Sequence, residues 1–182
     1  ANGWKRDEAY SFSSAGSGNW ELRLPVSSMK HGDLYKWLVS WNGGEGERIP
    51  AYARRVVQDN ATKIFSAQIW ELPEYKWKHP APAKVANPLI YEAHIGMSTE
   101  EYGMGSYNSF RREVLPHIAS LGYNVIQLMA IQEHPYYGSF GYQVSSYFAP
   151  SSRFGTPEEL KELIDEAHSL KISVVLDIIH SH

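Results

Sequence analysis

The sequence predicts a chain of two parts, a small β-sandwich followed by the beginning of a parallel β/α fold. From Tyr10 to about Ile69 the apolar residues alternate along the chain, which is the period of half-buried strands. After residue 89 strand patterns and helix patterns follow one another instead, as in parallel sheets with connecting helices. A proline-rich segment lies between the two regions and marks the boundary.

The strands of the first part are short and separated by turn residues. They are predicted over residues 20–24, 35–41, 54–57 and 64–69. The second of them ends at Asn42-Gly43-Gly44, a strong turn signal. Short strands at this spacing are typical of a β-sandwich. Because alternation by itself accounts for Trp20, Trp37 and Trp41, we expect these three rings to pack in a core.

Four prolines fall between residues 73 and 88, at Pro73, Pro80, Pro82 and Pro88. Proline lacks a backbone donor and favours extended backbone. We therefore interpret this segment as an extended, solvated linker between the two parts.

The second part begins with a predicted strand over residues 89–94. Ser106 can then cap a helix. The apolar positions of this helix share one face and are Phe110, Val114, Ile118 and Leu121. Pro116 is expected to kink the helix or divide it in two. A second strand is predicted at 124–129.

The clearest local signal is the helix start at residue 156. Thr156, Pro157 and Glu159 supply the N-cap, a proline at the first helical position and the capping-box carboxylate. The buried stripe predicted behind them consists of Leu160, Leu163, Ile164, Ala167 and Leu170. The segment 173–179 is almost continuously apolar, which is typical of a parallel strand covered on both faces.

The order strand, helix, strand, helix, strand fits either a doubly wound sheet or a (β/α) barrel. A complete eight-stranded barrel needs about 250 residues, whereas residues 89–182 number 94. Three parallel strands alone leave an apolar edge uncovered. We therefore expect residues 88–182 not to fold stably in isolation.

Composition excludes several classes of function. The 182 residues include 17 Lys and Arg against 20 Asp and Glu, a formal net charge of −3, so no broad basic field is available for nucleic acid or an anionic membrane. The absence of cysteine excludes disulfides, thiol nucleophiles and thiolate metal sites. No apolar run approaches the roughly 18 residues of a membrane-spanning helix. The chain begins at Ala1 without a signal-peptide pattern or an initiator Met, so we expect upstream sequence to be missing.

A long loop between the second strand and the second helix, from about residue 130 to 155, is the first candidate for function. Six aromatic residues lie within residues 136–148 of this loop, at Tyr136, Tyr137, Phe140, Tyr142, Tyr147 and Phe148. Gly138 and Gly141 allow tight turns between them. Planar rings with hydroxyl tips suit a ligand with apolar C–H faces and polar edges, such as a pyranose sugar. The alternative is that the rings only pack the loop onto the sheet.

The end of the last strand is the second candidate. Asp177, His180 and His182 follow the apolar run, and ligands bind at the carboxyl ends of strands in α/β folds. His180 and His182 could also ligate a metal together with Asp177. A third His or carboxylate at metal spacing is missing from the sequence, and no metal is predicted.

Three further titratable residues could take part in chemistry. His94 also lies near the end of a strand, where we interpret it as a core residue in preference to one supporting a site. Glu92 and Glu133 are candidate carboxylates, although neither has a sequence setting that identifies it as an acid or a nucleophile.

Several segments match the pattern of a known family. They are residues 18–25, 46–51, 90–97, 127–134, 136–142 and 177–182. Together they resemble the glycogen and starch branching enzymes of the α-amylase family, over nearly the whole chain. The tyrosine-rich segment 136–142 is specific to branching enzymes within that family, and 177–182 resembles the first conserved region of the family.

The resemblance implies an immunoglobulin-like carbohydrate-binding β-sandwich over residues 1–80. It implies that residues 81–182 are the first part of a (β/α)8 barrel, truncated after its third strand. The proline-rich boundary at residues 73–88 agrees with this division.

The resemblance also implies an activity for the parent enzyme. Such enzymes cut an α-1,4-glucan and transfer the cut chain to a 6-hydroxyl, making an α-1,6 branch by a retaining mechanism with two carboxylates about 5–5.5 Å apart. The implied partners are α-glucans, namely glycogen, amylose and amylopectin, with no nucleic acid, membrane or cofactor. The implied location is cytoplasmic.

Residue by residue, the resemblance assigns substrate binding to Tyr142, His182, Asp177 and Tyr137. Tyr142 matches a tyrosine that stacks under the sugar at the cleavage point, His182 a histidine that hydrogen-bonds that sugar, and Asp177 an aspartate that orients neighbouring residues. No catalytic residue is assigned, because the family's catalytic carboxylates come from later strands. Ser181 stands where calcium-binding amylases carry Asn, so no calcium is expected. The 182-residue chain is expected to be inactive alone.

Two other interpretations remain open. The chain could be a short, non-catalytic glucan-binding protein that uses Trp20, Trp37, Trp41 and the loop tyrosines as binding platforms. It could also be a metal-dependent barrel hydrolase that uses His180 and His182.

Overall fold

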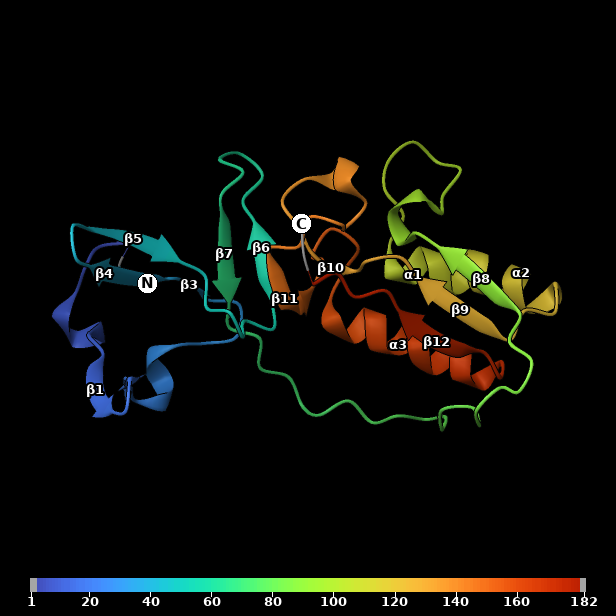
Figure 1. The fold of residues 1–182 in the computed structure, drawn as a ribbon, viewed down its shortest axis with the longest axis horizontal. Coiled ribbons are helices and arrows are strands. Elements are labelled where there is room, and N and C mark those ends of the chain that lie inside the picture. Colours follow the sequence, from blue (N-terminus) through green and yellow to red (C-terminus); the bar gives the residue numbers. More distant parts are fainter. Residues whose placement is uncertain (1–2, 181–182) are drawn as a thin grey trace.

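The computed structural model describes residues 3–180. Small antiparallel sheets lie at one end of the molecule, and a parallel sheet with its helices lies at the other (Figure 1). A long segment without helix or strand leads from the first region to the second.

Two hairpins form the N-terminal end. β1 (Ser13–Gly16) pairs with β2 (Asn19–Glu21), and β4 (Trp37–Trp41) pairs with β5 (Gly44–Arg48). The predicted turn is confirmed, since Trp41 pairs with Gly44 across Asn42 and Gly43, and Gly43 has the positive φ of 87° that such turns need. Short 3-10 helices, η1 (Glu8–Tyr10) and η2 (Val26–Ser28), flank the first hairpin.

The immunoglobulin-like sandwich is not confirmed. The hairpins are separate two-stranded sheets, and none of residues 3–49 is buried. Trp20, Trp37 and Trp41 are 66%, 43% and 50% exposed, so the expectation that they pack in a core is wrong for the described chain. Alternation gives β4 an apolar face made of Trp37, Val39 and Trp41, but all three residues are exposed.

A third small sheet contains β3 (Leu34–Tyr35), β7 (Phe65–Gln68) and β6 (Val56–Gln58), in that spatial order. Both pairings are antiparallel. Ala53, Val56 and Ala67 form a small buried cluster with Ala149 from the second part of the chain. This sheet, unlike the hairpins, is therefore attached to the second part.

The proline-rich segment has no helix or strand, as predicted, but part of it is bound to a helix. Asp165, buried on α3 (Pro157–Ser169), accepts hydrogen bonds from the Tyr75 hydroxyl at 2.9 Å, the Lys78 N–H at 3.0 Å and the His79 N–H at 2.9 Å. These contacts bind residues 75–79 to α3, whereas most of residues 73–88 are exposed, as expected of a solvated linker. The boundary between residues 80 and 81 stays a prediction.

The second part is built on a three-stranded parallel sheet of β8 (Ile90–Ala93), β9 (Val125–Leu128) and β12 (Ser173–Leu176), with β9 in the centre. The three predicted strands are confirmed, and Glu92, Gln127 and Val175 lie in register across the sheet. The third strand is shorter than predicted and is not covered on both faces: Val175 and Leu176 are 46% and 39% exposed. They are exposed because β12 is an edge strand.

The helices lie over one face of this sheet. Ser106 caps α1 (Tyr107–Ser109), which continues through a π-helical segment η4 (Phe110–Val114) into α2 (Leu115–Ser120). Pro116 lies in the first turn of α2, so the predicted division of the helix is confirmed. Thr156 and Glu159 form the predicted capping box of α3.

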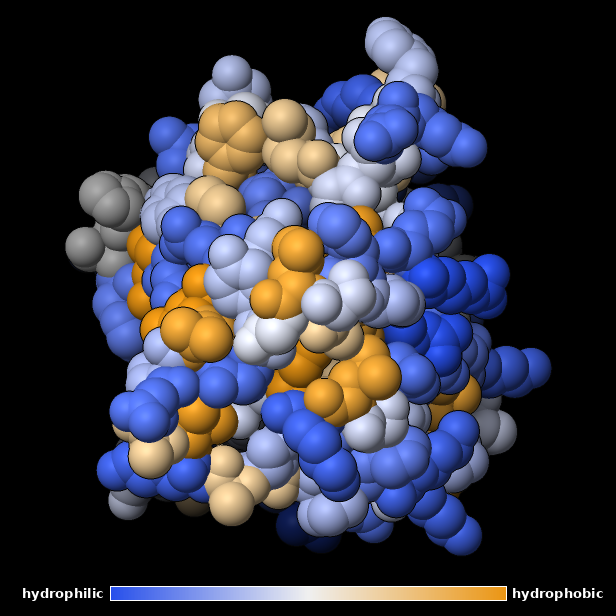
Figure 2. All heavy atoms as spheres, turned by 90° about the vertical axis from the view of Figure 1, so that its right-hand side faces the viewer, coloured by the Kyte–Doolittle hydropathy of each residue, from blue (hydrophilic) through white to orange (hydrophobic). Residues whose placement is uncertain are grey.

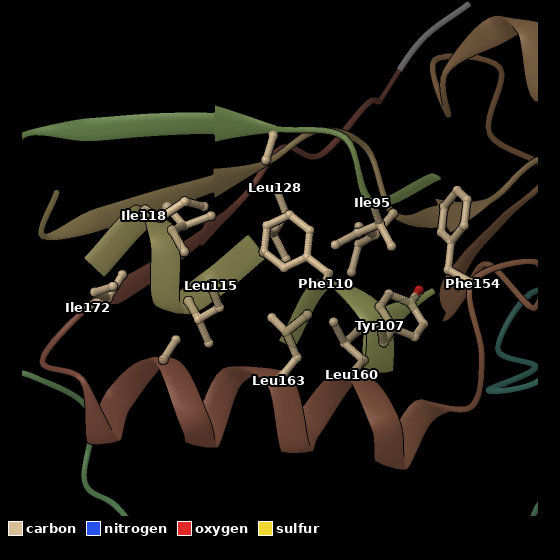
Figure 3. Close-up of a cluster of buried hydrophobic side chains, with 14 residues drawn as sticks. Ile95, Tyr107, Phe110, Leu115, Ile118, Leu128, Phe154, Leu160, Leu163 and Ile172 are labelled. Atoms are coloured by element: carbon tan, nitrogen blue, oxygen red, sulfur yellow. The ribbon is translucent and has the colours of Figure 1, made fainter. Parts of the chain in front are cut away.

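The main core lies between these helices and the sheet (Figure 3). Phe110 of η4 lies beside Leu128 of β9, while Leu160 and Leu163 point up from α3. Leu121 and Leu170, predicted in the two stripes, are 56% and 39% exposed because they lie at the C-caps of α2 and α3.

The long loop contains structure that the sequence pattern did not predict. β10 (Gln132–Glu133) pairs antiparallel with β11 (Ser146–Pro150), and the 3-10 turn η5 (Tyr137–Ser139) lies between them. A strand of two residues is too short to show alternation, so this hairpin leaves no periodic signal.

The end of the molecule nearest the β8 and α2 segments has a mixed surface, with apolar side chains grouped among polar ones (Figure 2). Leu89, Leu121 and Tyr123 line a shallow hollow in the second part. Within residues 3–180 no helix has the length and apolar character needed to cross a membrane.

Candidate functional site

The candidate site lies at the carboxyl ends of the parallel strands. Asp177 directly follows β12, and its N–H donates to the Leu128 carbonyl at the end of β9, 3.0 Å away. This bond extends the parallel pairing by one residue and fixes where the Asp177 side chain begins. Function in parallel α/β folds is usually placed at this end of the sheet.

The structure brings Tyr142 from the long loop onto Asp177. The Tyr142 hydroxyl donates to Asp177 Oδ2 at 2.8 Å, although 35 residues separate the two in sequence. This hydrogen bond, together with burial and the negative charges of Asp177 and Glu92, raises the pKa of Tyr142 to about 12. The ring is therefore neutral and held in one orientation at neutral pH.

Glu92 and Gln127 extend the polar surface beside this pair. Gln127 Nε2 donates to Glu92 Oε1 at 3.0 Å, and both residues lie on the sheet face opposite the core. Gln127 was not predicted as a site residue. A polar side chain inside the otherwise apolar strand 124–129 was the signal that could have identified it.

A close glycine contact fixes the backbone beside Tyr142. Gly141 has φ of 88°, and a Cβ there would collide with the Ala130 carbonyl oxygen. Only glycine combines this conformation with such a close approach at low cost. The loop therefore crosses the end of β9 closely before it presents Tyr142.

Glu133 lies inside the protein and is not exposed to substrate. Its side chain is fully buried and is bound by the hydroxyls of Ser151 and Ser152 at 3.2 and 2.8 Å. The two-carboxylate chemistry of glycosidases needs accessible groups, so Glu133 serves structure in this chain.

His94 is a buried residue, in agreement with the core interpretation. Its Nδ1 accepts from the Met97 N–H at 3.2 Å, which caps the short 3-10 helix η3 (Ile95–Met97). Burial, with a smaller contribution from His134, lowers the pKa of His94. The neutral imidazole packs edge-on against Phe140 and Phe154.

Tyr137 packs at the edge of the core. Its ring lies edge-on to His94 at 6.0 Å, and a Cβ on Gly96 would stand 2.8 Å from the Tyr137 hydroxyl oxygen. Burial raises the pKa of Tyr137. The contacts described for Tyr137 are with the core, and its part in substrate binding stays a prediction.

The histidine pair at the chain end is only partly described. His180 is exposed, and its carbonyl accepts from the Tyr147 hydroxyl at 3.4 Å. His182 and Ser181 lie outside the described residues. Among residues 3–180 no group of three or more histidine or carboxylate side chains could hold a metal ion.

Comparison with known proteins identifies a family model and several relatives that this chain resembles. The family model described as alpha amylase, catalytic domain, matches residues 97–182. The 1,4-alpha-glucan-branching enzyme of Yarrowia lipolytica is 47% identical over the whole chain, and that of Rhizophagus irregularis is 46% identical over the whole chain. These matches cover 28% and 27% of the two relatives, so the chain spans about a quarter of their length.

A solved structure supports the fold. The putative alpha amylase from Salmonella typhimurium is 27% identical, with a TM-score of 0.75 over 92% of this chain and 27% of that protein. The parallel sheet, with its sequential strands and helices over one face, is therefore part of an α-amylase-type fold.

Proposed function

Because the chain belongs with the 1,4-α-glucan-branching enzymes of the α-amylase family, we propose that its parent protein cuts α-1,4-glucan and rejoins the cut chain as an α-1,6 branch. The chain supplies part of the sugar site for this reaction. The observation that carries the proposal is the Tyr142–Asp177 hydrogen bond of 2.8 Å at the carboxyl end of the sheet.

In this proposal Tyr142 is the platform of the site. An aromatic ring face can pack against the C–H face of a glucose ring. Because the Tyr142 hydroxyl donates a hydrogen bond to Asp177, the Tyr142 ring is held in a fixed orientation. Asp177 retains acceptor capacity for neighbouring groups, since a carboxylate has two oxygens. The pair therefore orients substrate and takes no part in bond cleavage.

Catalysis needs two carboxylates in addition to this pair. We propose a retaining double displacement, in which one carboxylate attacks the anomeric carbon and the other first gives and later takes a proton. Parts of the enzyme beyond this chain would supply both groups, so the 182-residue chain alone is expected to bind glucan without branching it. A cytoplasmic location is proposed on the same resemblance.

The N-terminal region offers a second glucan-binding surface. Trp20, Trp37 and Trp41 are exposed on the hairpins, where rings are available to sugars. This observation favours a carbohydrate-binding role for residues 1–80 and equally supports the alternative of a non-catalytic glucan-binding protein. Glycogen, amylose and amylopectin are the proposed ligands.

The test is maltoheptaose binding by the chain and its variants, measured by calorimetry. Tyr142→Ala is expected to weaken binding by about tenfold, because it removes the aromatic face on which the C–H face of a glucose ring would pack. Tyr102→Ala is the matched control, since Tyr102 is fully exposed. Equal affinity of the two variants would remove Tyr142 from the site.

A second experiment separates the enzyme from the binding protein. The longer protein is expected to lower amylose–iodine absorbance, and Tyr142→Ala in it is expected to slow that change. The alternative predicts glucan retention by the longer protein with unchanged absorbance.

A further inference from the structure

The loop that carries Tyr142 is closed at its base by an ion pair between a buried carboxylate and a partly buried guanidinium. Glu133 lies near the beginning of the loop, in β10, and Arg153 lies just after β11, near its end. Arg153 Nη1 is 3.3 Å from Glu133 Oε1, and the side chains are 13% and 0% exposed. An ion pair so far from solvent persists only where its remaining hydrogen-bonding groups are satisfied.

Those groups are satisfied by the two ends of the loop. Glu133 also accepts from the Ser152 N–H at 2.8 Å, and from the two serine hydroxyls at residues 151 and 152. Arg153 donates to the carbonyl oxygens of His134 and Pro135. The residues that begin the loop are thus bound to those that end it, through both side chains of the pair.

The same arginine reaches the N-terminal part of the chain. Arg153 Nη2 is 3.4 Å from Gln58 Oε1 on β6, and the guanidinium lies 5.8 Å from the centre of the Phe65 ring on β7. Arg153 is also the only Lys or Arg between Arg112 and Lys161 in the sequence. One cation therefore contacts both ends of the loop and the small sheet of residues 34–68.

The Tyr142–Asp177 contact depends on how this loop is placed. Asp177 is fixed to the parallel sheet by its N–H bond to Leu128, whereas Tyr142 belongs to the loop. The two loop ends are joined by the backbone pairing of β10 with β11 and by the side-chain contacts of the ion pair. A change at these contacts would change the position of the loop, and with it the position of Tyr142 relative to Asp177.

We propose that Arg153 is a positioning residue, which places Tyr142 on Asp177 and couples this placement to the attachment of the β3–β7–β6 sheet. The placement of Tyr142 on Asp177 by Arg153 does not depend on which ligand the site binds. Its consequence for glucan binding rests on the proposed function.

The main experiment follows the Tyr142 ring in the chain labelled with ¹³C at tyrosine Cζ. The Tyr142 signal is identified by its loss in Tyr142→Phe, and its titration is followed as the pH is raised. In Arg153→Met we expect the pKa of Tyr142 to fall from about 12 toward the ordinary tyrosine value of about 10. An unchanged titration in a folded Arg153→Met chain would overturn the proposal.

Two further variants keep the test decisive if Arg153→Met does not fold. Arg153→Lys keeps the charge but loses the planar fork, and we expect it to recover only part of the pKa shift. Gln58→Ala removes the contact with β6 alone, and we expect a smaller decrease in the pKa of Tyr142. No decrease in Gln58→Ala would overturn the coupling between the sheet and the loop.

A destabilising change elsewhere separates positioning from loss of stability. Asp165→Asn breaks the contacts between α3 and the proline-rich segment and touches neither Arg153 nor Tyr142. It is expected to lower the melting temperature while leaving the Tyr142 titration unchanged. A shift in this control equal to that in Arg153→Met would mean that stability alone moves Tyr142, and would contradict the proposal.

Maltoheptaose affinity, measured on the same variants, distinguishes failure of this proposal from failure of the proposed function. A misplaced ring is expected to weaken binding by about tenfold in Arg153→Met. A shifted Tyr142 titration with unchanged affinity would support the positioning role and contradict the role of Tyr142 in glucan binding.

Discussion

The hairpins of residues 13–48 and the β/α segment of residues 90–176 show opposite relations between sequence pattern and burial. In the hairpins clear alternation produces strands, but every residue of β4 is exposed. In the β/α segment strands of similar length lie over a core that includes Phe110, Ile126 and Leu163, each with no exposed surface. The difference is that helices within the β/α segment cover its sheet, whereas a two-stranded hairpin contains no element that can cover its own face.

The largest effect is expected from truncating the β/α core. Leu163→Ala leaves a cavity between α3 and the sheet, so the free energy of unfolding should fall by about 2–5 kcal/mol. Urea unfolding followed by far-UV circular dichroism measures the change. A loss below about 1 kcal/mol would contradict the view that this core stabilises the chain.

The next largest effect concerns the contacts between the proline-rich segment and α3. Asp165→Asn removes the charge that binds Tyr75, Lys78 and His79. Hydrogen bonds to a charged group contribute about 1.5–3 kcal/mol, and a loss of this size is expected in urea unfolding. Glu100→Gln, at an exposed carboxylate, is the control, and an equal loss there would refute a special role for Asp165.

The same carboxylate gives stability a pH dependence. Burial by itself would raise the pKa of Asp165, but hydrogen bonds from Lys78, Tyr75 and His79 outweigh it and lower the pKa to about 2. The folded-state pKa is thus below the unfolded value of about 3.9, so Asp165 stabilises the fold above about pH 4 and loses this effect as the pH falls toward 2. Thermal melts at pH 2 to 6 should show a shallower acid dependence in Asp165→Asn; parallel curves would contradict the assignment.

A smaller effect is expected at the start of α3. Thr156→Ala removes the side-chain acceptor of the Glu159 N–H, and the free energy of unfolding should fall by about 1 kcal/mol. Thr156→Ser keeps the acceptor and is the matched control. Equal losses in the two variants would show that the cap does not contribute.

The smallest effect is expected in the hairpins. Trp41→Ala removes a half-exposed ring that stacks with Arg48, a contact that contributes less than about 1 kcal/mol at an exposed site. Urea unfolding should therefore barely change. A loss comparable to that of Leu163→Ala would show that the hairpins are covered in solution and would remove the contrast between the two regions.

The features that could be predicted from the sequence are those determined by residues close together in the chain. The Thr156 cap, the division at Pro116 and the Asn42-Gly43 turn each depend on interactions within a few residues, and all three are present. The three parallel strands were also predicted, because their apolar runs are distinct from the helix patterns between them.

Contacts between distant segments could not be predicted in this way. Asp165 meets its partners 86 to 90 residues away, and Arg153 meets Gln58 across 95 residues. An acid within the apolar stripe of a helix, and a long loop with one cation and one carboxylate, were the available signs, but neither identifies the distant partner. Likewise, Tyr142 and Asp177 were expected in one site from family resemblance, while their hydrogen bond came only from the structure.

The role of the Tyr142–Asp177 pair is tested by mapping where maltoheptaose contacts the chain, by NMR of ¹³C-labelled tyrosine and ¹⁵N-labelled tryptophan side chains. We expect the Tyr142 signal to shift on addition of the sugar, the shift to disappear in Asp177→Ala, and the Tyr102 signal to be unaffected. A Tyr142 signal that stays in place at saturating sugar would contradict the assignment of the Tyr142–Asp177 pair as the sugar site.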